Sequence, residues 1–377
     1  MRCAADATAP TCIPSARGNA SPRTGPAFTL CTSPPNFHRM DPLTSEARDH
    51  QRLDWARTAL GDPGAILGRA STDAGFRSYW RSRGAEPSRI VMDSPPALED
   101  VRPWLAVRDL LEAGGVRVPQ VLARDVENGF LLLEDLGGPT LAQVLDADNA
   151  DALFDGAIDQ LLKLQAIPPP PSMTVFGEAL LQRDAGLFEE WFLGTHLGIQ
   201  LDCGEAEALQ LVQRRLMDNA LAQPRVLVHR DFMPRNLMPV QPGPAVLDFQ
   251  DCVAGPVAYD PVSLFKDAFL SWPLARVDAW LAQYHARAVA AGLPVPSLPV
   301  FLRDADWSGV QRHLKILGIF ARLHHRDGKP KYLADAPRFI AYLEQVLPRH
   351  PQLQPLQSLL ERRIVPAMAA IAARDDA

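Results

Sequence analysis

The sequence predicts an α+β chain with two lobes, a small antiparallel sheet followed by a larger and mainly helical part. Short apolar segments separated by turn-rich stretches occupy residues 65–134, as expected for a small sheet. From residue 139 onward, long segments with apolar residues at helical spacing dominate. Between these regions, LLLEDLGG (131–138) ends in a glycine pair typical of a connector. We therefore expect an amino-terminal lobe over 40–138 and a carboxy-terminal lobe over 139–377.

The elements of the first lobe follow from local patterns. SEARDHQRLDWARTAL (45–60) has apolar residues near helical spacing and is followed by Gly61, which predicts a helix. Three strand candidates come next, and LEDVRPWLAVRDLLEAGG (98–115) predicts a helix that ends in a glycine pair. Two further strands are expected on either side of the Asn128-Gly129 turn. The three earlier strand candidates are AILGRA (65–70), RSYWRSR (77–83) and RIVMD (89–93).

Residues 1–39 differ in composition from the rest of the chain. They are rich in Pro, Ala, Ser and Thr and contain no sustained apolar run of the kind found in a secretory signal. Such a composition cannot bury enough apolar surface to fold. We expect this tail to be disordered and dispensable, or Met40 to be the natural start.

Bulk composition excludes several classes of protein. A formal net charge of −6 argues against a general nucleic-acid binder. No apolar run approaches the roughly 18 residues that a membrane span needs. None of the cysteines forms a CxxC pair or a zinc-ligand cluster with histidine, so a reducing cytoplasm fits best. Nothing implies an obligate protein partner. The five cysteines are Cys3, Cys12, Cys31, Cys203 and Cys252.

The most informative stretch is VLVHRDFMPRNLM (226–238), in which a short apolar strand leads into His229, Asp231 and Asn236. Next, LMPVQPGPAVLDFQD (237–251) reads as two short strands around a turn, which should return Asp248 to the side of Asn236. An amide oxygen and a carboxylate suit Mg²⁺ held together with substrate phosphates. Asp231 would lie close by, able to accept a proton from a hydroxyl group. This is the arrangement used for phosphoryl transfer.

These motifs carry a family resemblance. HRDFMPRNLM (229–238) followed by VLDFQD (246–251) resembles the aminoglycoside-phosphotransferase and choline-kinase branch of the protein-kinase-like fold. In that branch an Asp, here Asp260 in GPVAYDPVSLFKDAF (255–269), opens the helix after the metal loop. STDAGFRSYWR (71–81), VMDSPP (91–96) and RHLKILGIFARLHHRDGKPKYL (312–333) are similar to the anomeric N-acetylmuramate/N-acetylglucosamine kinases of bacterial cell-wall recycling. The resemblance extends from about residue 45 to the end of the chain and implies ATP, Mg²⁺ and an amino-sugar acceptor.

The expected ATP contacts depart from the pattern of kinase-like folds. STDAGF (71–76) carries a single glycine, so the turn over the phosphates would be formed by Ser71, Thr72 and Asp73, unless it is an ordinary hairpin turn. The third strand of such folds carries a Lys, but Met92 stands at that place here. The replacement cations that we consider are Arg77 and Arg81, with Glu99 or Glu112 as the partner carboxylate.

The connector and the catalytic loop carry further expectations. Leu133, Glu134 and Leu136 fall where a hinge would contact adenine, although Glu134 and Asp135 could also be merely exposed acids. His229 is expected to be structural and to hold the loop through a carboxylate such as Asp260.

The acceptor site should come from the helical lobe. Arg312 and Arg322 share a stripe of one helix with Lys315 and Arg326, at spacings of three, four and seven residues. The stripe is either a solvated basic face or an attractant for an acidic sugar, such as the lactyl carboxylate of N-acetylmuramate. Further candidates for acceptor contacts are Arg235 and Asp251. The acidic residues Asp248 and Asp251 keep an aminoglycoside or another small alcohol open as the acceptor.

Two other function classes can be weighed on the same residues. A non-catalytic binding module with this fold would be expected to have lost Asp231, Asn236 or Asp248, and all three are present. A protein kinase needs an activation segment after Asp248, but GPVAYDP (255–261) follows too soon to leave room for one. The sequence therefore favours a small-molecule kinase.

Overall fold

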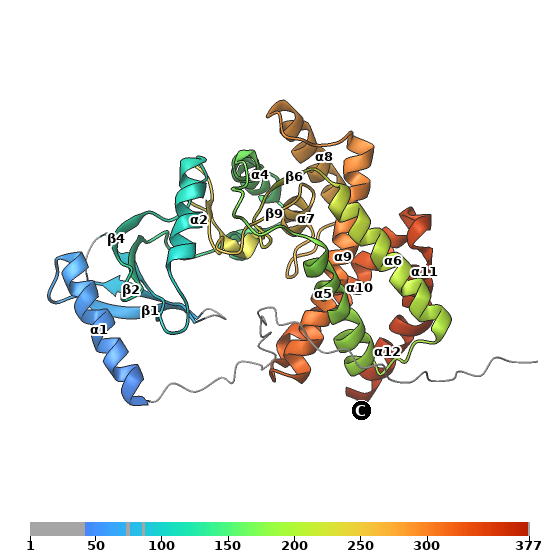
Figure 1. Ribbon diagram of the computed structural model, residues 1–377, viewed down its shortest axis with the longest axis horizontal. Coiled ribbons are helices and arrows are strands. Elements are labelled where there is room, and N and C mark those ends of the chain that lie inside the picture. The colour runs from blue at the N-terminus through green and yellow to red at the C-terminus, as the bar shows by residue number, and fades with distance from the viewer. Residues whose placement is uncertain (1–41, 73–75, 85–86, 376–377) are drawn as a thin grey trace, which may run out of the picture. The chain divides into compact units, whose positions relative to one another are not determined.

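The computed structural model describes residues 42–72, 76–84 and 87–375 (Figure 1). The expected tail over 1–39 and the turn residue Asp73 lie outside these ranges. The chain divides into two units, residues 1–48 and 49–377. The site and the contacts described below belong to the second unit.

The amino-terminal lobe contains a five-stranded antiparallel sheet, as predicted, and its strand order is β1-β2-β3-β5-β4. Helix α1 (Pro42–Leu60) contributes Ala56 to one face of the sheet, where Val91 and Leu132 are buried. Helix α2 (Arg102–Ala113) covers the other face, where Met92 and Leu131 are buried. The strands are β1 (Ile66–Thr72), β2 (Ser78–Arg83), β3 (Arg89–Asp93), β4 (Val121–Asp125) and β5 (Phe130–Glu134).

The turn between β4 and β5 shows why a glycine stands at position 129. Gly129 has φ +71°, and a Cβ atom there would lie 1.9 Å from the Ser94 carbonyl oxygen. Gly129 instead accepts a hydrogen bond from the Ser94 amide at 2.9 Å. The Asn-Gly turn predicted from the sequence therefore also anchors the end of β3.

The carboxy-terminal lobe is mainly helical, as predicted. Two short strand pairs interrupt it and frame the loop that carries Asp231: β6 (Arg225–Val228) with β9 (Val253–Pro256), and β7 (Leu237–Met238) with β8 (Ala245–Val246). Its α-helices are α3 (Leu141–Val144), α4 (Ala150–Ala166), α5 (Glu178–Leu187), α6 (Cys203–Ala222), α7 (Tyr259–Phe265), α8 (Leu274–Ala290), α9 (Leu298–His325), α10 (Ala336–Val346), α11 (Gln354–Leu359) and α12 (Val365–Asp375). The remaining helical segments are two π-helices, η1 (Phe188–His196) and η6 (Leu360–Ile364), and the 3₁₀ turns η2 (Pro234–Asn236), η3 (Pro330–Asp335), η4 (Leu347–Arg349) and η5 (Pro351–Leu353).

Helix α9 runs through the middle of this lobe. It packs against η1, α6, α7 and α10, so side chains on most of its sides are buried. At Gly318 a Cβ atom would lie 2.4 Å from the carbonyl group of Leu187, so only glycine allows the backbones to approach this closely. In the described part of the chain, no helix has the length and apolar character needed to cross a bilayer.

Candidate active site

The loop after β6 carries a strained residue. Arg230 has φ +76°, a left-handed conformation that residues other than glycine rarely adopt. Asp260, in the first turn of α7, accepts hydrogen bonds from the amides of His229 at 2.7 Å and Arg230 at 3.0 Å. A fully buried carboxylate therefore holds the backbone of the loop in this shape.

The expectation that the His229 imidazole binds Asp260 is wrong. Asp260 binds the backbone, while His229 Nε2 donates to the Leu247 carbonyl oxygen at 2.9 Å and Nδ1 accepts from the Asp231 amide at 3.3 Å. Burial lowers the pKa of His229, although nearby carboxylates oppose this effect. A neutral ring with its proton on Nε2 satisfies both contacts. His229 thus links the catalytic loop to the strand that precedes Asp248.

The hairpin returns Asp248 to Asn236, as predicted. Asn236 Nδ2 donates to the Asp231 carbonyl oxygen at 2.9 Å and lies 3.4 Å from Asp248 Oδ2. Asp248 is exposed and also has a left-handed backbone, with φ +61°. Gln250 Nε2 donates to Asp248 Oδ1 at 2.8 Å. Strained residues of this kind cluster at functional sites.

The donor set at this point fits a magnesium ion. Asp248 offers an exposed carboxylate, and no described residue makes a hydrogen bond to the side-chain oxygen of Asn236. Hard oxygen ligands in small number, completed by water and phosphate, are what Mg²⁺ prefers. The two residues are therefore suited to hold the ion.

Arg312 does not belong to a solvated face. Its side chain is almost fully buried, with 4% exposure for the residue, and Nη1 donates to the Arg230 carbonyl oxygen at 3.2 Å and to the Tyr259 hydroxyl at 3.4 Å. Lys315 is also engaged, through an ion pair with the buried Asp184 at 3.1 Å. The basic-face reading is therefore wrong for these two positions, because α9 is packed on most of its sides. Among the four, only Arg326 is exposed.

Two contacts around Arg312 were not anticipated from the sequence. Tyr259 presents its ring 5.5 Å from the Arg312 guanidinium carbon. Burial raises the pKa of Asp260 to about 7, although its amide hydrogen bonds and the charge of Arg312 work in the opposite direction. Tyr259 and Asp260 belong to the segment 255–269 that was singled out from the sequence. Nothing in the spacing of that segment indicated that α9 would pack against it.

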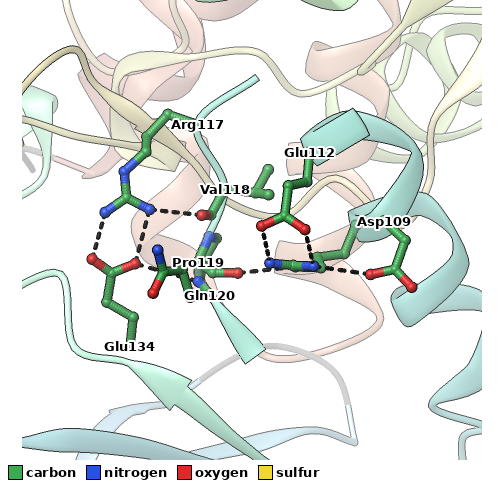
Figure 2. Close-up of polar contacts among 8 residues, drawn as sticks. Asp109, Glu112, Arg117, Val118, Pro119, Gln120 and Glu134 are labelled. Carbon is green, nitrogen blue, oxygen red and sulfur yellow. Dashed lines mark hydrogen bonds and ion pairs between the residues drawn. The ribbon is translucent and has the colours of Figure 1, made fainter. Parts of the chain in front are cut away.

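The acids of the connector are not simply exposed. Figure 2 shows the carboxylate of Glu134 facing the guanidinium of Arg117, with Nη1 and Oε2 2.8 Å apart. The hydrogen bond from Arg117 lowers the pKa of Glu134. Asp135 accepts from Arg81 at 2.6 and 2.9 Å and from Ser88 at 2.7 Å. The exposed-acid reading is therefore wrong for both residues.

These pairings narrow the search for the phosphate-binding cation. Arg81 is occupied by Asp135 and by the Gly137 carbonyl oxygen. Glu112, considered as the partner carboxylate, binds Arg108 instead, at 2.6 and 2.5 Å (Figure 2). Arg77 and Glu99 form the remaining pair, with Arg77 Nε 3.3 Å from Glu99 Oε1.

The other expected nucleotide and acceptor residues are placed as follows. Ser71 is exposed near the end of β1, and Thr72 is the last residue of that strand. Leu133 is buried at the end of β5, and Leu136 is half-buried after it. Arg235 and Asp251 are exposed next to the loop and the hairpin, and Arg322 is half-buried on α9. The Arg235 guanidinium carbon lies 5.1 Å from the centre of the Phe269 ring.

The comparison with known proteins can now be set beside this geometry. A family model described as the phosphotransferase enzyme family matches residues 67–297. The chain belongs to this family. The matched region contains the sheet from the second residue of β1 onward, together with the loop and hairpin that carry Asp231, Asn236 and Asp248.

Two relatives of this phosphotransferase share the same name. Proteins of Pseudomonas putida and Pseudomonas aeruginosa, both named N-acetylmuramate/N-acetylglucosamine kinase, are 52% and 51% identical to it. The first match covers 83% of this chain and 93% of the relative, and the second covers 84% and 97%. A solved aminoglycoside phosphotransferase, APH(2'')-Ib with ADP bound, has a TM-score of 0.54 at 15% identity and covers 78% of this chain and 97% of its own. At that identity the likeness shows a shared fold.

Proposed function

We propose that this phosphotransferase is an ATP-dependent kinase that phosphorylates the anomeric hydroxyl of N-acetylmuramate, N-acetylglucosamine or both. The product would be a sugar 1-phosphate formed during peptidoglycan recycling. The observation that carries the proposal is the meeting of Asp231, Asn236 and Asp248 at one end of the hairpin. The names of relatives at 52% and 51% identity support the choice of sugar.

Asp231 is the proposed catalytic residue. Its carboxylate orients the acceptor hydroxyl and takes its proton while the sugar oxygen forms a bond to the γ-phosphorus. The bond between that phosphorus and the β–γ bridging oxygen breaks, and ADP leaves. An anomeric hydroxyl is more acidic than an ordinary alcohol, so a carboxylate is a sufficient base. The strained loop held by Asp260 fixes the position of Asp231.

Asn236 and Asp248 would hold Mg²⁺. When bound there, the ion supplies positive charge beside the phosphate oxygens. Gln250, which donates to Asp248 Oδ1, would keep the carboxylate turned so that Oδ2 stays on the side of Asn236. The residues of the chain thus set the geometry in which the phosphates are received.

The nucleotide would lie along the sheet and the connector. Backbone groups from Leu133 to Leu136 are proposed to contact adenine, with Glu134 turned aside by its pair with Arg117. Ser71 and Thr72, which belong to the end of β1 and not to a turn, are proposed to lie over the phosphates; Asp73 lies outside the described residues. The ADP-bound aminoglycoside phosphotransferase of the same fold supports a nucleotide of this class.

The acceptor is proposed to contact Arg235 and Asp251, which are exposed next to the catalytic loop. Arg312 is assigned to the loop instead of the sugar, because its Nη1 atom donates to the Arg230 carbonyl oxygen and to the Tyr259 hydroxyl. Arg322 lies ten residues further along α9, about 15 Å at the rise of a helix. That distance argues against a contact with the sugar that Asp231 holds.

Replacing Asp231 tests the mechanism. Asp231→Asn keeps the size of the side chain but removes the base, so turnover should fall on the order of 10²-fold or more. The measurement is ADP release with N-acetylmuramate and with N-acetylglucosamine, together with a thermal unfolding curve. Glu127→Gln, the same chemical change at an exposed site of the sheet lobe, serves as the control. Turnover of Asp231→Asn within a factor of three of wild type would reject the assignment.

A further inference from the structure

Arg77 is a buried cation with unused hydrogen-bond donors. The residue stands immediately before β2 and is 7% exposed. Its Nε and Nη1 atoms are buried and make no hydrogen bond to any described residue. Among the described residues, its ion-pair partner is Glu99, with Nε and Oε1 3.3 Å apart. A guanidinium has five N–H donors, and leaving them buried without acceptors is costly.

The direction of the Arg77 side chain follows from the strand. Tyr79 packs on the core that contains α2, while Trp80 packs on the opposite face with Ala56. Side chains alternate along a strand, so Arg77 shares the face of Tyr79. Its contact with Glu99, just before α2, agrees with this placement.

The packing on this face of the sheet extends to Phe249, which is next to the proposed magnesium ligand Asp248. Trp104 of α2 packs against Phe249, with ring centroids 5.1 Å apart, and Phe249 adjoins Asp248. Met92, which pairs with Tyr79 across β2 and β3, is fully buried on this face and offers no charge. Arg89, the cation of β3, alternates onto the opposite face from Met92. On the Met92 face, Arg77 stands just before β2 and beside Glu99.

Arg81 and Arg83 share this face of β2 by the same alternation; Arg83 is exposed at the end of the strand, and Arg81 is engaged elsewhere. Two of its nitrogens donate to Asp135, and one of these also donates to the Gly137 carbonyl oxygen. Arg52 belongs to the opposite face, where it binds Asp93 and lies 3.7 Å from the centre of the Trp80 ring. Among Arg52, Arg77 and Arg81, Arg77 is the one whose guanidinium makes no hydrogen bond to a described residue.

We propose that Arg77, positioned by Glu99, binds the α- and β-phosphate oxygens of the nucleotide. The planar guanidinium matches two phosphate oxygens at once, and its charge is permanent. Glu99 holds Nε, which leaves Nη1 to donate to phosphate. The assignment rests on the proposed kinase function, because it requires that this chain binds a nucleoside phosphate.

Binding measurements that vary the number of phosphates test this role. Calorimetry of the full chain with adenosine and with ADP should show that Arg77→Gln raises the Kd for ADP about tenfold or more. Its Kd for adenosine should stay within about twofold of wild type. Arg77→Lys keeps the charge but loses the planar guanidinium, so its Kd for ADP should lie between those of wild type and Arg77→Gln. The control is Arg102→Gln, an exposed arginine of the same lobe paired with Asp100 and Glu127.

A double-mutant comparison of ADP binding tests the role of Glu99. If Glu99 acts by positioning Arg77, Glu99→Gln should weaken ADP binding in the wild-type background and change nothing further in the Arg77→Gln background. Additive losses in the double variant would show that Glu99 acts independently of Arg77.

The outcomes separate this inference from the proposed function. An unchanged Kd for ADP, or equal losses for adenosine and ADP, would overturn the role of Arg77. Binding of ADP by wild type without phosphorylation of any sugar would remove the sugar-kinase proposal and leave Arg77 in place, whereas a wild type that binds no ADP would remove both. Should Arg77→Gln fail to unfold cooperatively, Arg77→Lys carries the comparison of ADP with adenosine.

Discussion

At the scale of single residues, the account depends on how a strained backbone is held at Arg230. A left-handed conformation at a residue other than glycine costs about 1–3 kcal/mol and persists only when its surroundings enforce it. Here Asp260 takes the amide of Arg230 and Arg312 donates to its carbonyl oxygen, so both ends of the residue are fixed. Arg312 is therefore a positioning residue for Asp231.

Arg312→Lys should expose this role. A lysine side chain ends one atom short of the Nη1 position, so its ammonium cannot keep both the Arg230 and the Tyr259 contacts of that nitrogen. We therefore expect a stability loss of about 2 kcal/mol, the scale of a hydrogen bond to a charged group. Because the loop and not the sugar is affected, kcat should fall equally for N-acetylmuramate and N-acetylglucosamine, with both KM values little changed. Steady-state kinetics and urea denaturation measure these effects.

The same variant distinguishes two roles of Arg312, fixing the backbone of Arg230 or binding the carboxylate of the sugar. A KM increase confined to N-acetylmuramate would show that Arg312 binds the lactyl carboxylate and would contradict the positioning role. Arg326→Lys on the same helix is the matched control, because Arg326 is exposed and pairs only with its neighbour Asp327 among the described residues.

At the scale of elements, α9 connects the catalytic loop to the rest of the helical lobe. Through Arg312 it touches the loop, and through Asp306 it binds Lys266, which follows α7 and is fully buried. His350 Nε2 lies 2.9 Å from the second oxygen of Asp306. A charged group with no exposure requires such partners, since unpaired burial is expensive.

Asp306→Asn should therefore be strongly destabilising, by about 3–5 kcal/mol, because it leaves the Lys266 charge buried and unpaired. Asp155→Asn removes an exposed partner of Arg287 and should cost about 0–1 kcal/mol. Urea denaturation at neutral pH compares the two variants. Equal, small effects would mean that Lys266 finds another partner or is neutral.

The pH dependence of stability gives a second test of this pair. Burial raises the pKa of Asp306, but the His350 hydrogen bond and the Lys266 charge outweigh it and lower the pKa to about 2. A carboxyl with a lowered folded pKa contributes stability above its unfolded value of about 4 and loses it as the pH falls toward 2. Wild type should lose stability across this window more steeply than Asp306→Asn. Parallel curves would contradict the assignment.

At the scale of the whole molecule, local sequence patterns predicted the architecture better than they predicted the contacts between side chains. The sheet and the hairpin that carries Asn236 and Asp248 followed from strand spacing and turn residues, which act over a few positions. The placement of Asp248 beside Asn236 followed from the same hairpin.

The errors share a physical cause. Arg312 reads as part of a polar stripe, and a stripe of this kind is usually solvated, but α9 is enclosed by other helices and buries Asp304, Asp306, Ser308 and His313 as well. Glu134 and Asp135 find their partners on other segments, at Arg117 and Arg81. Pairings between distant segments depend on tertiary packing, which the spacing along one segment does not encode.

The central claim concerns the acceptor, and the structure of the product tests it most directly. The full chain is incubated with ATP, Mg²⁺ and, separately, N-acetylmuramate, N-acetylglucosamine, glucose, choline or kanamycin, and each product is examined by phosphorus NMR. We predict turnover of one or both N-acetyl sugars and a phosphorus signal coupled to the anomeric proton. The methyl glycoside of N-acetylglucosamine, whose anomeric oxygen is blocked, should not react. Phosphate on O6, turnover of the methyl glycoside, or activity confined to kanamycin would contradict the account.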